Sequence, residues 1–159
     1  INAEDTFLDF APSTGPVPIV TIPSGPGVRC DTYLYSGATV SSFYDSLMAK
    51  LITWGQTFDE SRLRMLNALD DFYIQGVETS IPLYKTILNS EEYKTGQLST
   101  DFLKRFEMIE RLEKDLVQDR KDKQIPAIAS ALMHSEFYKS KIQSQNSANQ
   151  NWKNKMDSV

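Results

Sequence analysis

The sequence predicts an α+β fold in which a small antiparallel β core precedes packed helices. Residues 1–56 carry five of the seven glycines and five of the seven prolines, a density of helix-breaking residues that excludes long helices. Residues 57–142 instead carry apolar residues at helical spacing. The 159 residues are 40% hydrophobic and 24% charged, which is typical of one globular domain or of one domain with an appendage.

Three short runs predict strands. Residues 17–22 (VPIVTI) contain a proline, which favours an edge strand or a strand start. Residues 47–54 (LMAKLITW) end in β-favouring side chains, which favour a strand over a helix. Residues 28–35 (VRCDTYLY) alternate, and one predicted face consists of Val28, Cys30, Thr32 and Leu34.

A glycine-rich segment, Ser24–Gly27 (SGPG), separates the runs at 17–22 and 28–35. A phosphate-binding loop needs a following helix whose amides point at the phosphate. A β-like run follows instead, and Pro26 lacks an amide donor. The segment is therefore interpreted as a hairpin turn.

Two helices and a short strand are predicted next. Thr57 or Asp59 can cap the first helix, whose apolar positions lie three apart at Leu63, Leu66, Leu69 and Phe72. Residues 73–77 predict a strand with a glycine break. Thr79 or Ser80 can cap the second helix, which has Pro82 in its first turn and ends before Gly96.

The last third of the chain differs in character. Ser99 or Thr100 can cap one helix with an apolar stripe over 102–117, and a second stripe covers 125–137. From residue 143 onward the chain is mostly Gln, Asn, Ser and Lys, which predicts a disordered tail.

Charge and composition exclude several classes of function. The net charge of -4 argues against nucleic-acid binding, which needs a basic patch. No apolar run approaches the roughly 20 residues that span a bilayer. With one cysteine and one histidine, a disulfide is impossible and a zinc site improbable. Cys30 is interpreted as a small core residue, and His134 as a solvated or core-edge residue.

Three charged residues are the candidates for chemistry. Asp45 and Lys50 end a mostly apolar run, and in a strand they would point to opposite faces. An aspartate entering an apolar element is costly unless paired, so Asp45 is functional, a capping residue or part of a surface ion pair. Arg29 suits an interface or a carboxylate partner, or it is a solvated strand residue. The residues alone yield no self-sufficient active site.

Several segments also resemble one family. In order they are residues 1–5 (INAED), 24–29 (SGPGVR), 44–51 (YDSLMAKL), 64–69 (RMLNAL), 76–82 (GVETSIP) and 100–103 (TDFL). Their order and spacing resemble the C-terminal domain of biotin carboxylases, with its Gly-Gly-x-Gly-Val-Arg hairpin and Tyr-Asp-Ser-Met-x-x-Lys-Leu signature. The resemblance implies a barrel-sandwich-hybrid-like domain over 1–104. Beyond the usual end of the family, the apolar stripes predict a helical extension over 105–142, and the polar composition predicts a disordered tail over 143–159.

The resemblance also implies an activity. Biotin carboxylases are ATP-grasp ligases that use MgATP and bicarbonate to carboxylate biotin on a carrier, through carboxyphosphate. In that family the nucleotide and Mg²⁺ are held mainly by parts that precede this segment. An arginine that steadies the biotin enolate stands directly before the Ile-Asn-Ala-Glu-Asp motif. Residues 1–159 alone are therefore expected to be inactive and to have no metal site of their own.

Roles carried over from the family fall on five residues. Asp45 matches an aspartate on the biotin side of the site that can pair with the active-site arginine, and Lys50 would supply supporting charge. Thr100 falls near a position that contacts the adenine. Arg29 matches a hairpin arginine near the dimer interface. Pro26 stands where bacterial members often have an aromatic interface residue, and this departure argues against a dimer of the bacterial type.

The implied partners are the preceding ATP-grasp domains, a biotin carboxyl carrier protein, a second copy in a homodimer and a carboxyltransferase subunit. The implied location is cytoplasmic. The last 55 residues contain no Met-Lys-Met acceptor, so they are not the carrier. Two alternatives stay open: a non-catalytic assembly module of a carboxylase complex, and an ATP-grasp ligase for another acceptor such as urea. The acyl acceptor, whether acetyl-CoA, propionyl-CoA or pyruvate, is left undetermined.

Overall fold

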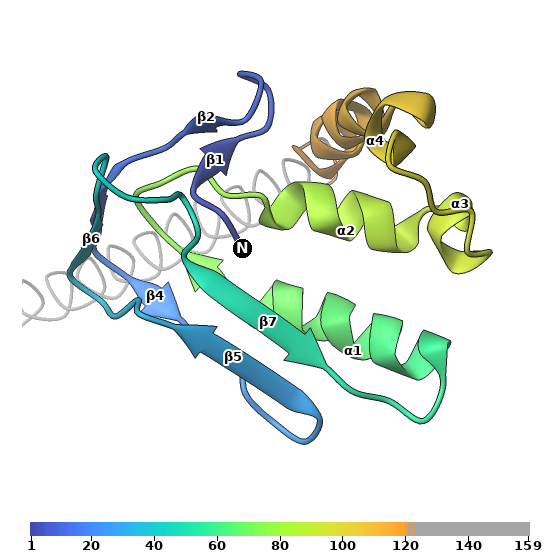
Figure 1. Cartoon of the computed structure of the whole chain (residues 1–159), viewed down its shortest axis with the longest axis horizontal. Coiled ribbons are helices and arrows are strands. Elements are labelled where there is room, and N and C mark those ends of the chain that lie inside the picture. The colour runs from blue at the N-terminus through green and yellow to red at the C-terminus, as the bar shows by residue number, and fades with distance from the viewer. Residues whose placement is uncertain (121, 123–159) are drawn as a thin grey trace, which may run out of the picture. The chain divides into compact units, whose positions relative to one another are not determined.

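A computed structural model of the chain describes residues 1–120 and 122, and residues 1–114 form one compact unit (Figure 1). The strands are Glu4–Asp5 (β1), Ala11–Pro12 (β2), Gly15–Val17 (β3), Val20–Thr21 (β4), Val28–Thr32 (β5), Ala38–Val40 (β6), Ala49–Thr53 (β7) and Tyr73–Ile74 (β8). The helices are Phe58–Asp71 (α1), Ile81–Asn89 (α2), Glu91–Lys94 (α3) and Phe102–Arg105 (α4), and residues 108–120 are also helical. The predicted mixture of helices and small antiparallel sheets is confirmed.

The described strands form four two-stranded antiparallel sheets, β1–β2, β3–β6, β4–β8 and β5–β7. The β5–β7 pair is the longest and runs from Val28 opposite Thr53 to Thr32 opposite Ala49. Residues 49–53 therefore form the strand that their β-favouring side chains predict. The predicted alternation of residues 28–34 is also confirmed, since the even-numbered side chains are half-buried or buried and Arg29, Asp31 and Tyr33 are exposed.

Two predictions about the first strands are wrong. The run 17–22 divides into β3 and β4, with Pro18 and Ile19 between them. Ser24–Gly27 does form a turn, in which the Val28 amide donates to the Gly25 carbonyl at 3.1 Å, but the turn closes no hairpin. Instead β4 pairs with β8 and β5 with β7. The Trp54 amide donates to the Gly27 carbonyl at 2.9 Å, so the end of the turn already belongs to the β5–β7 ladder.

The start of the chain lies along the other edge of β7. The Ile1 carbonyl accepts hydrogen bonds from the amides of Met48 (2.9 Å) and Ala49 (3.2 Å). Asn2 forms an antiparallel bridge with Leu47, and the Ala3 amide donates to the Ser46 carbonyl at 2.8 Å. The segment that leads into β7 is therefore held from both sides.

The first helix begins where the sequence predicts, and of its four predicted apolar positions Leu66, Leu69 and Phe72 pack in the core while Leu63 does not. Thr57 is the N-cap, and its hydroxyl accepts from the Glu60 amide at 3.1 Å. Leu63, predicted to be apolar core, is 51% exposed, whereas Ala68 and Leu69 are buried. Positions spaced strictly three apart turn by about 60° around a helix at each step, so Leu63 and Leu69 cannot share one face.

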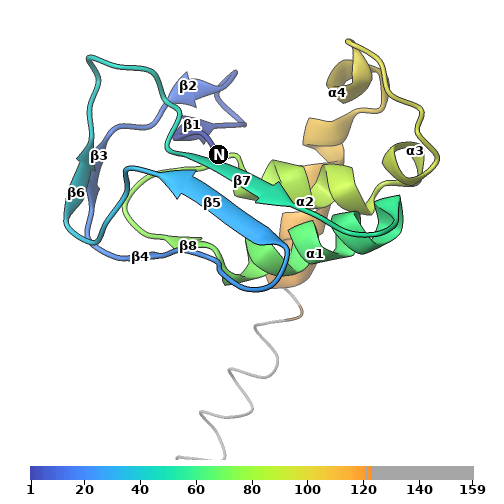
Figure 2. The ribbon, with the colours of Figure 1, turned by 60° about the horizontal axis from the view of Figure 1, so that its bottom comes forward.

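Two hydrophobic clusters form the core. One gathers around β3 and β6 and consists of Ala3, Val17, Leu34, Ala38, Val40 and Met48. The other lies between β7, α1 and α2 and consists of Ala49, Leu69, Phe72, Ile81 and Leu88. Figure 2 shows α1 and α2 side by side next to β7. Since Met48 and Ala49 belong to different clusters, the start of β7 joins the two halves of the core.

The predicted single helix over 102–117 is interrupted. It ends after Arg105, Glu107 adopts a left-handed φ of 51°, and a new helix starts at residue 108. The interruption allows Phe102, Met108 and Leu112 all to be buried. The predicted stripe over 125–137, the tail from 143 and His134 lie outside the described residues.

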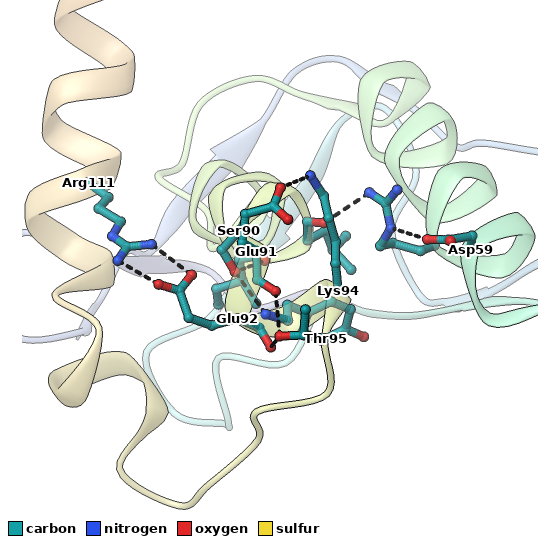
Figure 3. Close-up of polar contacts among 11 residues, drawn as sticks. Asp59, Ser90, Glu91, Glu92, Lys94, Thr95 and Arg111 are labelled. Atoms are coloured by element: carbon teal, nitrogen blue, oxygen red, sulfur yellow. Dashed lines mark hydrogen bonds and ion pairs between the residues drawn. The ribbon is translucent and has the colours of Figure 1, made fainter.

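An ion pair ties the second of these helices to α3. Both terminal nitrogens of Arg111 donate to the carboxylate of Glu92 at 2.9 Å, as Figure 3 shows beside the more exposed Lys94–Glu91 pair. Only 19% of the Glu92 side chain is exposed. The hydrogen bonds from Arg111 are the main cause that lowers the pKa of Glu92 below its ordinary value of 4.5.

Gly76, which follows β8, provides a test of the close approach between this segment and Pro16 in β3. Its φ is +108°, and a Cβ atom on it would lie 2.2 Å from the Pro16 carbonyl oxygen. We expect Gly76→Ala to lower the free energy of unfolding by at least about 2 kcal/mol, measured by urea denaturation. Gly37→Ala is the matched control, because Gly37 has a φ of +93° but open space around it. Equal losses in the two variants would mean that the close approach to Pro16 does not matter.

The Glu92–Arg111 pair predicts a change in acid stability. A carboxyl whose folded pKa is lowered stabilises the fold above its unfolded pKa, and that stability is lost as the pH falls through the lower folded value. We expect Arg111→Met to reduce stability at pH 7 and to flatten its decline below about pH 4.5, measured by urea denaturation at several pH values. Lys94→Met, which breaks an exposed pair, is the control. If the free energy of unfolding of Arg111→Met fell with pH as steeply as that of the wild type, Arg111 would not be the cause of the lowered pKa of Glu92.

Candidate functional site

Three of the segments that resemble biotin carboxylases meet at Asn2. The main chain of Asn2 bridges to Leu47, from the segment 44–51. On its other side the Asn2 amide donates to the Ser80 hydroxyl at 3.0 Å, and the Ser80 amide donates to the Asn2 carbonyl at 3.1 Å. Ser80 is buried at the N-cap of α2, and its side chain makes no capping bond within the helix. Residues far apart in sequence therefore form one polar junction.

A carboxylate extends this junction. Oε1 of Glu4 accepts from Nδ2 of Asn2 at 3.0 Å and from the Ser46 hydroxyl at 2.5 Å. All three residues are half-buried. Hydrogen bonds to an ionised carboxylate are shorter and stronger than bonds between neutral groups. The Glu4 side chain thus fixes Ser46, the residue that directly follows Asp45.

Asp45 lies outside β7, so the geometry that a shared strand would give to Asp45 and Lys50 does not apply. Asp45 is an exposed residue in the loop between β6 and β7. Its Oδ1 accepts from the Leu47 amide at 2.7 Å, a local turn that aspartate favours before a strand. Within residues 1–120 and 122 Asp45 has no ion-pair partner. Its second carboxylate oxygen is available to a group from elsewhere.

Lys50 and Arg29 share a different surface, the exposed face of β5 and β7. The Arg29 guanidinium donates to both oxygens of Asp31, with Nε–Oδ1 at 2.9 Å and Nη2–Oδ2 at 2.8 Å. Lys50 is the cross-strand neighbour of Asp31. The Arg29 hydrogen bond lowers the pKa of Asp31, and the charge of Lys50 adds a smaller contribution. Lys50 therefore associates with the Arg29–Asp31 pair.

The remaining predicted residues are dispersed. Pro26 is exposed in the turn before β5, and Thr100 is exposed in the turn before α4. Cys30 is half-buried beside the cluster of β7, α1 and α2, where burial raises the pKa of its thiol. That position agrees with its interpretation as a small core residue.

An open pocket of about 460 Å³ lies between the start of the chain, β7, α1 and α2. Its polar residues include Asn2 and Lys50, and most of its lining is apolar, for example Leu51, Met65, Leu69 and Ile87. The pocket was not predicted, because it depends on the pairing of residue 2 with residue 47, which no local pattern specifies.

Neither a cluster of metal ligands nor a phosphate loop at the glycine-rich turn is found in the described part of the chain. Among residues 1–120 and 122, no three His, Cys, Asp or Glu side chains gather as a metal site. The glycine-rich turn at 24–27 leads into β5 and so lacks the helix amides that bind phosphate. A search of the same residues for membrane-spanning helices finds none of sufficient length and apolarity.

Sequence reasoning missed Glu4, Ser46 and Ser80. Each lies inside a segment that resembles the biotin carboxylase family, so the signal was present. What was missing was the information that these segments lie next to one another. The polar cluster depends on contacts between residues about 40 to 80 positions apart.

Comparisons with known proteins assign the family. Residues 1–105 match the family model "Biotin carboxylase C-terminal domain". The chain is 36% identical to a pyruvate carboxylase subunit of Methanothermobacter thermautotrophicus, over 85% of this chain and 31% of that protein. It is 40% identical to biotin carboxylase 1 of Bacillus subtilis, over 69% of this chain and 24% of that protein. The chain belongs to the biotin carboxylase C-terminal domain family.

A solved structure supports the same assignment. The biotin carboxylase domain dimer of Hydrogenobacter thermophilus 2-oxoglutarate carboxylase, in complex with MgADP, ADP and bicarbonate, matches with a TM-score of 0.64. The identity is 36%, and the match covers 65% of this chain and 23% of that structure. The chain thus spans less than a third of the length of these relatives.

Replacing Ser80 tests whether its hydrogen bonds with Asn2 stabilise the fold. Ser80→Ala leaves the Asn2 amide without its acceptor in a buried place, which costs about 1–3 kcal/mol of unfolding free energy. Ser36→Ala is the matched control: its hydroxyl also accepts a backbone amide, that of Val20, but in an exposed place where water can substitute. Urea denaturation should show a clearly larger loss for Ser80→Ala. Equal losses would show that the junction is not a stabilising contact.

Proposed function

We propose that this chain is the C-terminal part of a longer biotin carboxylase that uses ATP, Mg²⁺ and bicarbonate to carboxylate biotin on a carrier protein. The observation that carries the proposal is the convergence of the three family segments at Asn2, with Asp45 beside the junction. By the family resemblance, ATP and Mg²⁺ would be held mainly by the preceding domains. Residues 1–159 alone would then be inactive.

Within that enzyme, Asp45 would border the biotin side of the site. The charges of Arg29, Arg64 and Arg111 are each engaged by a carboxylate of this chain, whereas Asp45 accepts a backbone amide and has no ion-pair partner among residues 1–120 and 122. A cation from outside the described residues would complete the pair. The antiparallel register directs a residue preceding Ile1 toward Ala49 and Lys50, about four residues from Asp45. Lys50 would then supply supporting charge beside the family's arginine.

The other roles follow the same relatives. Thr100 would approach the adenine. The outer face of β5 and β7, with the Arg29–Asp31 pair and exposed Tyr33, Ile52 and Trp54, would form a homodimer interface, although Pro26 argues that its contacts differ from those of the bacterial type. The carrier and a carboxyltransferase would be further partners, in the cytoplasm. Support comes from the related domain that forms a dimer.

A second candidate is a non-catalytic assembly module formed by the C-terminal extension. The family model ends at residue 105, yet the likeness to the Methanothermobacter protein covers 85% of this chain. That protein therefore shares part of the extension. A segment shared with a separate carboxylase subunit is suited to contact other members of the complex.

Replacement of Asp45 separates the two candidates. In the longer biotin carboxylase, we expect Asp45→Ala to reduce kcat/KM for free biotin by roughly 100-fold, because a preorganised charge at the site is lost. Biotin-dependent ATP hydrolysis is the measurement. Asp71→Ala, an exposed carboxylate at the end of α1, is the control and should match the wild type. Full activity in Asp45→Ala would remove the catalytic role and leave the assembly module.

A further inference from the structure

Asp45 is held in place from one side only. The residues that precede it are open to solvent, since Phe43 is 91% exposed and Tyr44 is 84% exposed. The residues that follow it are fixed: Ser46 and Leu47 pair with Ala3 and Asn2. The place of the Asp45 carboxylate therefore depends on what holds Ser46 and Leu47.

The side chain of Glu4 is the main polar contact of Ser46. The Ser46 hydroxyl donates to Oε1 of Glu4 at 2.5 Å, while the Ser46 carbonyl accepts from the Ala3 amide at 2.8 Å. The same Oε1 accepts from Nδ2 of Asn2, which orients the carboxylate within the junction.

We propose that Glu4 is a positioning residue for biotin carboxylation, which acts on Asp45 through Ser46. The inference rests on the proposed role of Asp45. Glu4 fixes the hydroxyl and hence the backbone of Ser46, and this fixes the turn in which the Leu47 amide binds Oδ1 of Asp45. Small displacements of a site residue cost up to roughly 100-fold in rate, so a remote contact of this kind matters.

The structure also predicts which replacement is tolerated. The contacts of Glu4 need an oxygen acceptor at the position of Oε1, and the amide oxygen of glutamine can accept both hydrogen bonds. Glu4→Gln should therefore recover most of the activity that Glu4→Ala loses. Ser46→Ala removes the hydroxyl donor and should reproduce the defect of Glu4→Ala without changing Glu4.

The experiment is a double-mutant cycle in the longer biotin carboxylase, with kcat/KM for free biotin as the readout. The variants are Glu4→Ala, Glu4→Gln, Ser46→Ala, Asp45→Ala and Glu4→Ala combined with Asp45→Ala, and Ser36→Ala is the remote control. If Glu4 acts through Asp45, the double variant should be no worse than Asp45→Ala alone, because the effects of residues that act as a unit do not add. The midpoint of thermal unfolding monitors the fold.

The outcomes distinguish this inference from the proposed function. An impaired Asp45→Ala together with a fully active Glu4→Ala and Ser46→Ala would overturn the role of Glu4 and leave the proposed function standing. Multiplied losses in the double variant, or no recovery in Glu4→Gln, would also overturn it. A fully active Asp45→Ala would overturn the proposed role of Asp45 itself. Should Glu4→Ala fail to fold, Ser46→Ala and its cycle with Asp45→Ala decide the question.

Discussion

The fold of residues 1–114 depends on how residues 46–53 are paired. This segment consists of β7 and the three residues before it, and it has a partner along each of its two edges. β5 lies along one edge, and residues 1–3 lie along the other. A two-stranded ribbon alone is marginally stable, so the additional pairing and the packing of α1 are what hold β7 in a fixed place. Met48 and Ala49 contribute to separate core clusters at the point where both edges are paired. Loss of the pairing to residues 1–3 would loosen both clusters.

The polar junction follows from the same pairing. Once Asn2 lies beside Leu47, its amide and carbonyl face α2, and Ser80 at the start of that helix satisfies both groups. A helix leaves its first amides and a strand leaves its outer edge in need of partners. Here the two sets of unpaired groups lie next to each other. The hydroxyl of buried Ser80 therefore binds the backbone of Asn2 instead of capping its own helix. The approach of the chain to Ser80 in turn passes Gly76, whose backbone touches Pro16.

Local patterns predicted the elements better than the contacts between them. The Thr57 cap, the strand at 49–53 and the alternation over 28–34 depend on neighbouring residues, and all three are confirmed. The hairpin at 24–27 was wrong because strand pairing is decided by residues far away in the chain. The break at Glu107 has no local signal, since a left-handed glutamate is unfavourable by itself and is offset by the burial of Met108 and Leu112. For the candidate site, the sequence proposed Asp45 but not Glu4, Ser46 or Ser80, because the proximity of these three residues depends on tertiary contacts.

The charges divide this domain into two surfaces with different properties. On the face of β5 and β7, the Arg29 fork is satisfied by Asp31 inside the domain, so that surface presents an internally neutralised pair among exposed apolar side chains. Covering this surface would still cost the desolvation of both charges, although each would keep its partner. At the loop before β7, Asp45 keeps one oxygen without a partner in the described residues, and the backbone beneath it is fixed by Glu4 and Ser46. A carboxylate that is both positioned and without a partner among the described residues is suited to bind a charge that arrives from outside, and for this reason the proposed role of the domain is assigned to the loop rather than to the strand face.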